Sequence, residues 1–179
     1  MTLTKNVYAL PFRKKDLIVA ISDPRAHFAH FKHAIDFALP EGAPLLAVKA
    51  GKVIDLKVDS KEGGADPKYA DIKYLNYITL EHSTGEFSQY LHIKHKSAKV
   101  KVDDKVKQGQ IIALSGNTGF STASHLHFQV FRLVDTDIGW DSLQIRFKER
   151  VYVRRKPKSI PKEMKKAMKE LERAKKSLR

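Results

Sequence analysis

Two histidines separated by a single residue are the strongest chemical signal in this sequence. His125 and His127 lie in HLHFQV (125–130), whose apolar residues alternate with them and predict a β-strand. Alternate side chains of a strand point to the same face, so both imidazoles face one side. Two imidazoles about 7 Å apart can hold one metal ion, or a metal ion and a catalytic group side by side. The alternative interpretation is a surface strand with two incidental histidines.

Two other segments carry groups that could complete such a site. Asp36 lies among apolar residues in AIDFA (34–38), where a carboxylate needs a cation or strong hydrogen-bond donors. A metal ion and a salt bridge to a lysine both meet that need. His92 closes a predicted strand at YLH (90–92), where a histidine could pack or react. The glycines of SGNTGFS (115–121) could cradle an anion, but this loop lacks the lysine and spacing of a phosphate-binding loop.

Together these residues favour a hydrolytic zinc site. Such a site needs three protein ligands, an open position for water and a basic group that does not bind the metal. The sequence contains no Cys, so disulfides and thiolate ligands are excluded and Zn2+ must be held by His, Asp or Glu. Asp36 and His127 can be two of the ligands. His92 and His125 can take the proton and stabilise the oxyanion.

Short strands must position these groups. Apolar alternation and frequent turn residues predict an all-β fold, a small and mostly antiparallel β-sheet or flattened barrel. A histidine-rich loop is expected at 23–32 and a long exposed loop at 59–71. The predicted strands are 6–12, 16–22, 34–39, 45–49, 52–58, 74–81, 86–91, 99–102, 111–114, 125–134, 143–147 and 150–154.

The length of 179 residues suits one domain, predicted here as residues 1–155, followed by a basic helical tail at 156–179. The tail carries half of the net charge of +14, which favours anionic partners. Its apolar residues recur at helical spacing, which predicts an amphipathic basic helix. Such a helix could solubilise the domain, anchor it to an anionic surface or self-associate.

Composition also argues against several classes of function. No apolar run is long enough to span a membrane, so no transmembrane segment is expected. The first ten residues do not read as a signal peptide. The basic tail has no aromatic interleaving, so specific nucleic-acid binding is not expected. Trp140, the only tryptophan, could stack on a ligand or serve packing, and His82 and His95 are predicted to be surface residues.

Six segments occur in a recognisable order: AIDFALPEGAPLLA (34–47), GKV (51–53), YLH (90–92), VKQGQII (106–112), SGNTG (115–119) and HLHF (125–128). In this order they resemble the lysostaphin-type (LytM-type) zinc metalloendopeptidases, over residues 27 to 132. The resemblance implies a small β-domain with a groove over a zinc ion. It also implies hydrolysis of peptide bonds in the stems or cross-bridges of bacterial peptidoglycan, outside the cell or in its envelope.

The resemblance assigns roles to single residues. Asp36 and His127 would be zinc ligands, and His92 and His125 would be the catalytic histidines beside the bound water. Asn76 and Thr118 lie in matching segments, where they would line the groove. Gln129 stands where the family often has Glu, and Ser124 where it often has Pro.

The first zinc ligand departs from the common family pattern, which places a His four residues before the Asp. Here that position is Lys32. His33 would face the opposite side of a straight strand, and His30 has the better parity. The stretch HFAHFKHAID (27–36) resembles a family variant with a longer loop, which favours His27 as the ligand and His30 as second choice.

Three functions remain open from the sequence. The first is a zinc metalloendopeptidase acting on a peptide or cell-wall polymer. The second is an inactive relative that binds the cell wall or activates other hydrolases, which would follow if only two metal ligands converge. The third is a carrier-like domain similar to biotinyl and lipoyl carriers, but the lysine expected in the hairpin turn is missing.

Overall fold

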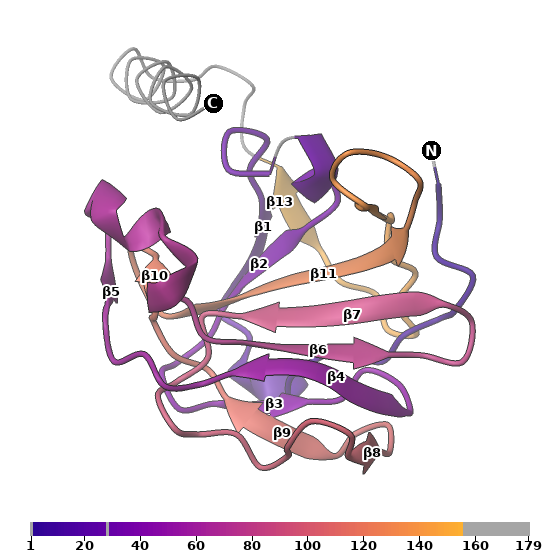
Figure 1. The fold of residues 1–179 in the computed structure, drawn as a ribbon, viewed down its shortest axis with the longest axis horizontal. Helices are drawn as coiled ribbons and strands as arrows, with labels where there is room; N and C mark the ends of the chain where they lie inside the picture. The colour runs from indigo at the N-terminus through magenta and orange to yellow at the C-terminus, as the bar shows by residue number, and fades with distance from the viewer. Residues whose placement is uncertain (1, 28, 156–179) are drawn as a thin grey trace.

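The structure is a computed structural model that describes residues 2–27 and 29–155. The basic helix predicted at 156–179 lies outside the described residues. A nine-stranded sheet dominates the fold (Figure 1), with the order β13-β1-β2-β11-β7-β6-β4-β8 and with β12 paired to β11. Its strands are β1 (Val19–Ser22), β2 (Ile35–Ala38), β4 (Gly51–Lys57), β6 (Tyr77–Glu81), β7 (Glu86–Leu91), β8 (Lys105–Val106), β11 (His125–Leu133), β12 (Trp140–Ser142) and β13 (Val153–Arg155).

The fold is all-β, as predicted, and its helical elements within the described residues are short 3-10 turns. The pairs of the large sheet are antiparallel except for β1 with β13. Two small sheets are added: β3 (Pro44–Leu46) with β9 (Ile111–Leu114), and β5 (Gly63–Gly64) with β10 (Gly119–Phe120). The 3-10 turns are η1 (Lys14–Asp16), η2 (Ala29–Phe31), η3 (Pro67–Ala70) and η4 (Ile72–Tyr74).

The core packs on one face of the large sheet. Strand residues that do not pack in the core emerge on the opposite face. Leu126, Phe128 and Val130 of β11 are fully buried in the core. Phe128 contacts Phe37 of β2 and Tyr90 of β7, with ring centroids 6.4 and 5.1 Å apart. Because side chains alternate along a strand, the residues between these apolar ones emerge on the opposite face. The core packing of β11 therefore sends its histidines to a single face.

The predicted loop at 59–71 forms a wall beside one end of the sheet. It contains β5 and η3, and β10 contacts η3 and η4 (Figure 1). Gly63 requires glycine, because a Cβ there would lie 1.9 Å from the carbonyl oxygen of Asn117. This close approach brings the wall against the loop that leads to His125.

Some predicted strands are wrong. The segment 6–12 makes isolated bridges, and Glu86 holds it by accepting hydrogen bonds from Asn6 N (3.0 Å) and Tyr8 Oη (2.9 Å). The segment 99–102 is irregular and donates one backbone hydrogen bond to the β9 strand. Side-chain anchoring of this kind leaves no signal in apolar alternation.

His82 is not a surface residue, because only 2% of it is exposed. Its Nδ1 bonds to Ala50 O and its Nε2 to Ser88 Oγ, both at 2.9 Å. In the described part of the chain, no helix is long and apolar enough to cross a membrane.

Candidate metal centre

The strand pair β2–β11 places a carboxylate directly opposite an imidazole. Asp36 and His127 are cross-strand partners in this antiparallel pair. Side chains at such positions lie on the same face, with Cβ atoms about 4.5–5.5 Å apart. Asp36 Oδ1 and His127 Nδ1 are 3.0 Å apart. The contact follows from strand register, which the alternation of core residues on both strands determines.

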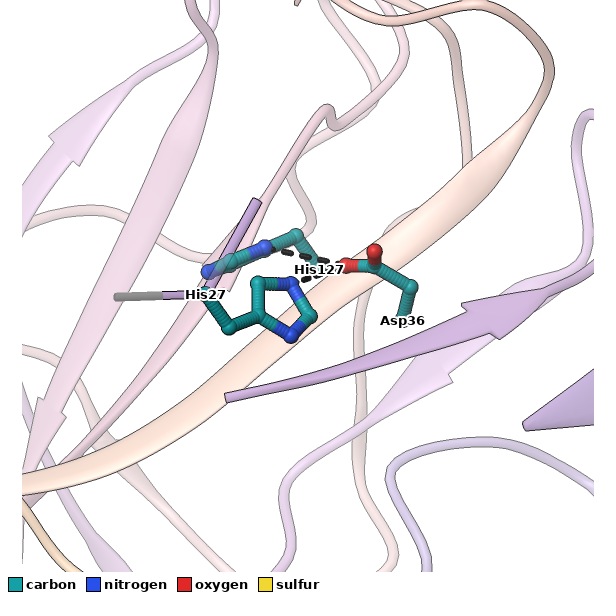
Figure 2. Close-up of side chains that lie close together, drawn as sticks. All are labelled: His27, Asp36 and His127. Carbon is teal, nitrogen blue, oxygen red and sulfur yellow. Dashed lines mark hydrogen bonds and ion pairs between the residues drawn. The ribbon is translucent and has the colours of Figure 1, made fainter. Parts of the chain in front are cut away.

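A third group reaches the same carboxylate from the loop after β1. His27 is 3% exposed, and its Nε2 lies 3.1 Å from Asp36 Oδ1. A turn fixes its backbone, because His27 N donates to Asp23 O at 2.7 Å. Figure 2 shows His27, Asp36 and His127 converging, and one ligand atom from each lies within 4.8 Å of the others. The structure thus brings together the three predicted ligands, and their binding of a metal stays a prediction.

The two alternative histidines of this loop lie elsewhere. The ring of His30 packs against Phe31 and Trp140, with centroids 4.4 and 4.6 Å away, beside a surface hollow. His33 donates its backbone N–H to Ser142 Oγ at 3.2 Å, and burial lowers the pKa of its imidazole. Neither belongs to the group of possible metal ligands found among the described residues. Trp140 lies in β12 and contacts Phe31, which favours packing as its role.

The three converging groups fit a zinc ion. Zinc bonds of about 2.0–2.1 Å in a tetrahedron place neighbouring ligand atoms about 3.3 Å apart. The two nitrogen–oxygen distances here, 3.1 and 3.0 Å, are close to that value. Burial by itself raises the pKa of Asp36, but hydrogen bonds from His127 and His27 outweigh it and hold the pKa below its usual range. Asp36 therefore offers a negative charge at neutral pH, beside two imidazoles.

Two further histidines lie beside the three candidate ligands. His125 Nε2 is 3.7 Å from Asp36 Oδ1, and the rings of His92 and His125 are 4.5 Å apart. His92 Nδ1 donates to Thr118 O at 2.6 Å, and His125 Nδ1 donates to Ala123 O at 2.8 Å. A neutral imidazole that donates from Nδ1 keeps a lone pair on Nε2. Each of the two predicted catalytic histidines therefore keeps an Nε2 lone pair that can accept a hydrogen bond.

Burial sets the charge of His92. It lowers the pKa of this imidazole to about 3, with the positive potential of His125 and His127 as further causes. His92 also adopts a φ of 64°, a left-handed conformation that few non-glycine residues take. The side chain is therefore held neutral, in an uncommon backbone conformation.

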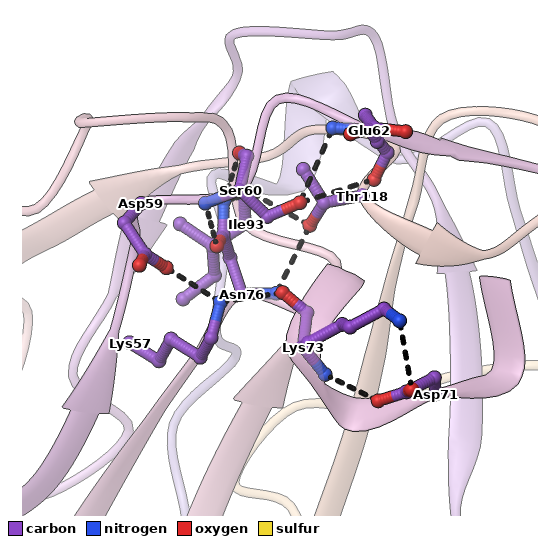
Figure 3. A network of polar contacts seen from close by, with 9 residues as sticks. All are labelled: Lys57, Asp59, Ser60, Glu62, Asp71, Lys73, Asn76, Ile93 and Thr118. Atoms are coloured by element: carbon purple, nitrogen blue, oxygen red, sulfur yellow. Dashed lines mark hydrogen bonds and ion pairs between the residues drawn. The ribbon is translucent and has the colours of Figure 1, made fainter.

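Asn76 and Thr118 do not line a groove, contrary to the expectation from the resemblance. They are 0% and 5% exposed. Asn76 Nδ2 donates to Ser60 O (2.9 Å) and Ile93 O (3.1 Å), and its Oδ1 accepts from Ser60 N (3.0 Å) (Figure 3). Thr118 Oγ1 accepts from Asn76 N at 3.2 Å and donates to Ile93 O at 3.0 Å. Their hydrogen bonds hold the 59–71 wall, through Ser60, beside Ile93, the residue that follows His92.

Ser121 is a supporting residue that the sequence did not single out. Its hydroxyl is 3.1 Å from His125 Nδ1 and donates to Asn117 Oδ1 at 2.6 Å. Ser121 is 4% exposed, although it lies in a loop rich in Gly, Ser and Thr. The sequence places Ser121 four residues before His125. A turn in the loop between them would bring its hydroxyl within reach of the imidazole, and this spacing is the signal that could have predicted the contact.

Known proteins that resemble this chain are peptidases. The model described as Peptidase family M23 matches residues 30–138. The chain is 39% identical over 98 residues to a glycyl-glycine endopeptidase of Staphylococcus capitis, covering 54% of this chain and 24% of that protein. It is 39% identical over 95 residues to a peptidoglycan DD-endopeptidase of Vibrio cholerae, covering 53% of this chain and 19% of that protein.

A solved structure is also similar. The catalytic domain of the antimicrobial peptidase lysostaphin from Staphylococcus simulans matches with 34% identity and a TM-score of 0.46. The match covers 62% of this chain and 74% of that one. The chain spans less than a quarter of the length of each curated relative named above.

Proposed function

This chain belongs to peptidase family M23, and we propose that it is a zinc-dependent endopeptidase that hydrolyses peptide bonds in peptidoglycan. The observation that carries the proposal is the convergence of His27, Asp36 and His127 beside two histidines with available Nε2 atoms. The substrate class rests on the relatives, which are named as endopeptidases of glycyl-glycine bonds and of peptidoglycan. The first name gives a type of peptide bond and the second gives the polymer, and the proposed substrate combines the two.

His27 Nε2, Asp36 Oδ1 and His127 Nδ1 would hold the metal. A zinc ion bound there would lower the pKa of a bound water to about 7 and polarise the scissile carbonyl. Asp36 supplies one negative charge, so a zinc ion held by these residues would leave the centre with a net positive charge toward a developing oxyanion.

The two remaining histidines differ in their surroundings, and this difference suggests a division of labour. The pKa of His92 is about 3, so this imidazole is a poor acceptor for a proton from the attacking water. Its Nε2 lone pair instead orients the water by accepting a hydrogen bond from it. The side chain of His125 is 19% exposed, and its Nε2 lies 3.7 Å from the carboxylate of Asp36. This partly exposed imidazole donates from Nδ1 and keeps a lone pair on Nε2 beside the proposed ligands, which suits His125 to general acid–base catalysis.

The proposed reaction moves one proton through His125. Nε2 of His125 takes a proton from the attacking water as the water oxygen bonds to the carbonyl carbon. The protonated imidazole then donates to the amide nitrogen and the C–N bond breaks, which gives a carboxylic acid and an amine. The remaining proton passes from the acid to the amine, so the products leave as a carboxylate and an ammonium ion. The Nδ1–H groups of His92 and His125 donate hydrogen bonds to Thr118 O and Ala123 O, and these bonds keep both rings in the required orientation.

The test is a zinc titration of purified protein by mass spectrometry, with hydrolysis of pentaglycine and isolated peptidoglycan as activity assays. We expect about one zinc per chain in the wild type and in His30→Ala, and none in His27→Ala or His127→Ala. His30→Ala is the matched control, because it removes a histidine of the same loop that lies outside the ligand group. Cleavage should follow zinc content.

Two outcomes would contradict the proposal. A wild type that takes up no zinc at neutral pH would leave a wall-binding or hydrolase-activating domain as the better interpretation. Zinc retained by His27→Ala but lost by His30→Ala would place the first ligand at His30. The anionic partner predicted for the basic tail depends on residues outside the described chain and stays a prediction.

A further inference from the structure

We propose that Gln129 is a positioning residue that accepts a hydrogen bond from the Nε2–H of His127, directly or through one water, and so holds the ring for metal binding. The inference rests on the proposed metal centre. It begins from two buried polar atoms, one on each residue, that lack a hydrogen-bond partner among the described residues.

The first of these atoms is His127 Nε2. The other ring nitrogen, Nδ1, faces Asp36 Oδ1 at 3.0 Å and belongs to the ligand group. An imidazole that gives the Nδ1 lone pair to a metal carries its proton on Nε2. Metal-binding histidines almost always donate this second N–H to a carboxylate, a carbonyl or a water. His127 therefore needs an acceptor on the side of the ring away from Asp36.

The second atom is Gln129 Oε1. Gln129 is fully buried and lies two residues after His127 on β11, so both side chains emerge on the same face of the sheet. The other neighbour of Gln129 on this face is Phe131, which stacks on Phe87 and has no side-chain donor. Of the two strand neighbours, only His127 can donate a hydrogen bond.

A ladder of side chains across three strands orients the Gln129 amide. Gln129 pairs with Gln89 of β7, and Gln89 pairs with Thr79 of β6. Gln89 Nε2 donates to Thr79 Oγ1 at 3.1 Å, so its Oε1 faces the other way. Gln129 Nε2 donates to that Oε1 at 2.8 Å. The amide of Gln129 therefore presents NH2 to Gln89 and leaves its oxygen for a different donor.

A neutral acceptor suits this position. The amide oxygen can fix the orientation of the His127 ring without adding a second negative charge beside Asp36. A carboxylate at position 129 would also accept the hydrogen bond and would pull more strongly on the Nε2 proton. The proposal therefore predicts opposite effects for an apolar substitution and an acidic one.

The experiment measures the zinc affinity of the whole chain by chelator competition, with the melting temperature of the metal-free protein as a second readout. We expect Gln129→Met, which keeps the length but has no acceptor, to weaken zinc binding about 10- to 100-fold. Gln129→Glu should bind zinc at least as tightly as the wild type. Thr79→Val is the matched control on the same ladder and should stay within a few-fold of wild type.

The outcomes separate this inference from the proposed function. A wild type without zinc contradicts the metal centre itself. A wild type that binds zinc beside a folded Gln129→Met of equal affinity contradicts only the role of Gln129. If Gln129→Met does not fold, the nitrogen-15 spectrum of the zinc-loaded wild type decides. A slowly exchanging His127 Nε2–H supports the proposal, and a ring protonated on Nδ1 overturns it.

Discussion

The proposed metal centre combines two regions that hold their candidate ligands in different ways. Asp36 and His127 belong to a strand pair, and their contact follows from the register of β2 with β11. His27 belongs to a loop, where a backbone hydrogen bond to Asp23 O and the contact with Asp36 place it. The first region is supported by the core, and the second by local turns. We infer that the strand pair determines where the site lies, and that the loop determines whether the site is complete.

The strand region should respond most strongly to loss of packing. Phe128 follows His127 on β11, is fully buried, and contacts Phe37 of β2 and Tyr90 of β7. Phe128→Ala should lower the free energy of unfolding by about 3–5 kcal/mol, because it removes a large core side chain and leaves a cavity. Urea denaturation measures this change.

The control for this prediction is Leu133→Ala on the same strand. Leu133 is 66% exposed, so its truncation should change the free energy of unfolding by no more than about 0.5 kcal/mol. Equal stabilities of the two variants would contradict the idea that the core supports the strand pair.

Acid should destabilise the metal-free protein through its buried histidines. The folded pKa of His92 is about 3, below its ordinary value of 6.5, because burial disfavours the charged ring. The unfolded chain therefore binds the extra proton below pH 6.5 while the folded chain does not. Stability should fall as the pH drops from about 6.5 and level off near 3, with about 3 kcal/mol lost by pH 4.

Melting temperatures of wild type and His92→Gln between pH 7 and 4, in the presence of a chelator, test this prediction. The variant should show a shallower decline. Burial also lowers the pKa of His82 and His127, so the melting temperature of His92→Gln should still fall in part as the pH drops. Parallel curves for the two proteins would show that His92 does not titrate as expected.

The wall beside His92 is a third element and depends on polar side chains. Asn76 satisfies backbone groups of Ser60 and Ile93, which Asn76→Ala would leave without these partners. The expected loss is about 1–3 kcal/mol of unfolding free energy. Because Thr118 O holds His92, turnover should fall while zinc content stays at the wild-type level.

Asn117→Ala offers a comparison from the loop that packs against this wall, because it removes the acceptor of the Ser121 hydroxyl, which lies beside His125. If Asn76→Ala changed zinc content as much as turnover, the wall would support the ligands as well as the catalytic histidines.

The strand region was largely predictable from the sequence, and the supporting residues were not. Alternation along 125–130 indicates both the strand and the face that carries His125 and His127. The strand at 34–39 could be placed in the same way, although β2 is shorter. The buried roles of Asn76, Ser121 and Gln129 depend on which strands become neighbours, and periodicity within one segment does not contain that information.

The choice of His27 over His30 shows the same limit. Parity along a straight strand favoured His30, but the chain turns at η2 and Ala29 adopts a φ of 50°, so parity does not hold across this segment. His27 was favoured only through resemblance to a family variant. A loop ligand is decided by turn geometry, which a strand period cannot describe.

The smallest expected effect concerns the loop that carries His27, and it tests whether a side-chain contact or the backbone turn places this residue. Arg25 bonds through Nε to Asp23 Oδ1 at 2.7 Å, within the turn whose carbonyl Asp23 O holds the backbone of His27. Arg25→Ala removes this contact but leaves the backbone hydrogen bond, so zinc affinity should fall by at most about five-fold. Chelator competition at low and high salt measures it, and the difference from wild type should shrink at high salt. A loss as large as that of His27→Ala would mean that the Asp23–Arg25 pair, rather than the turn itself, places the loop ligand.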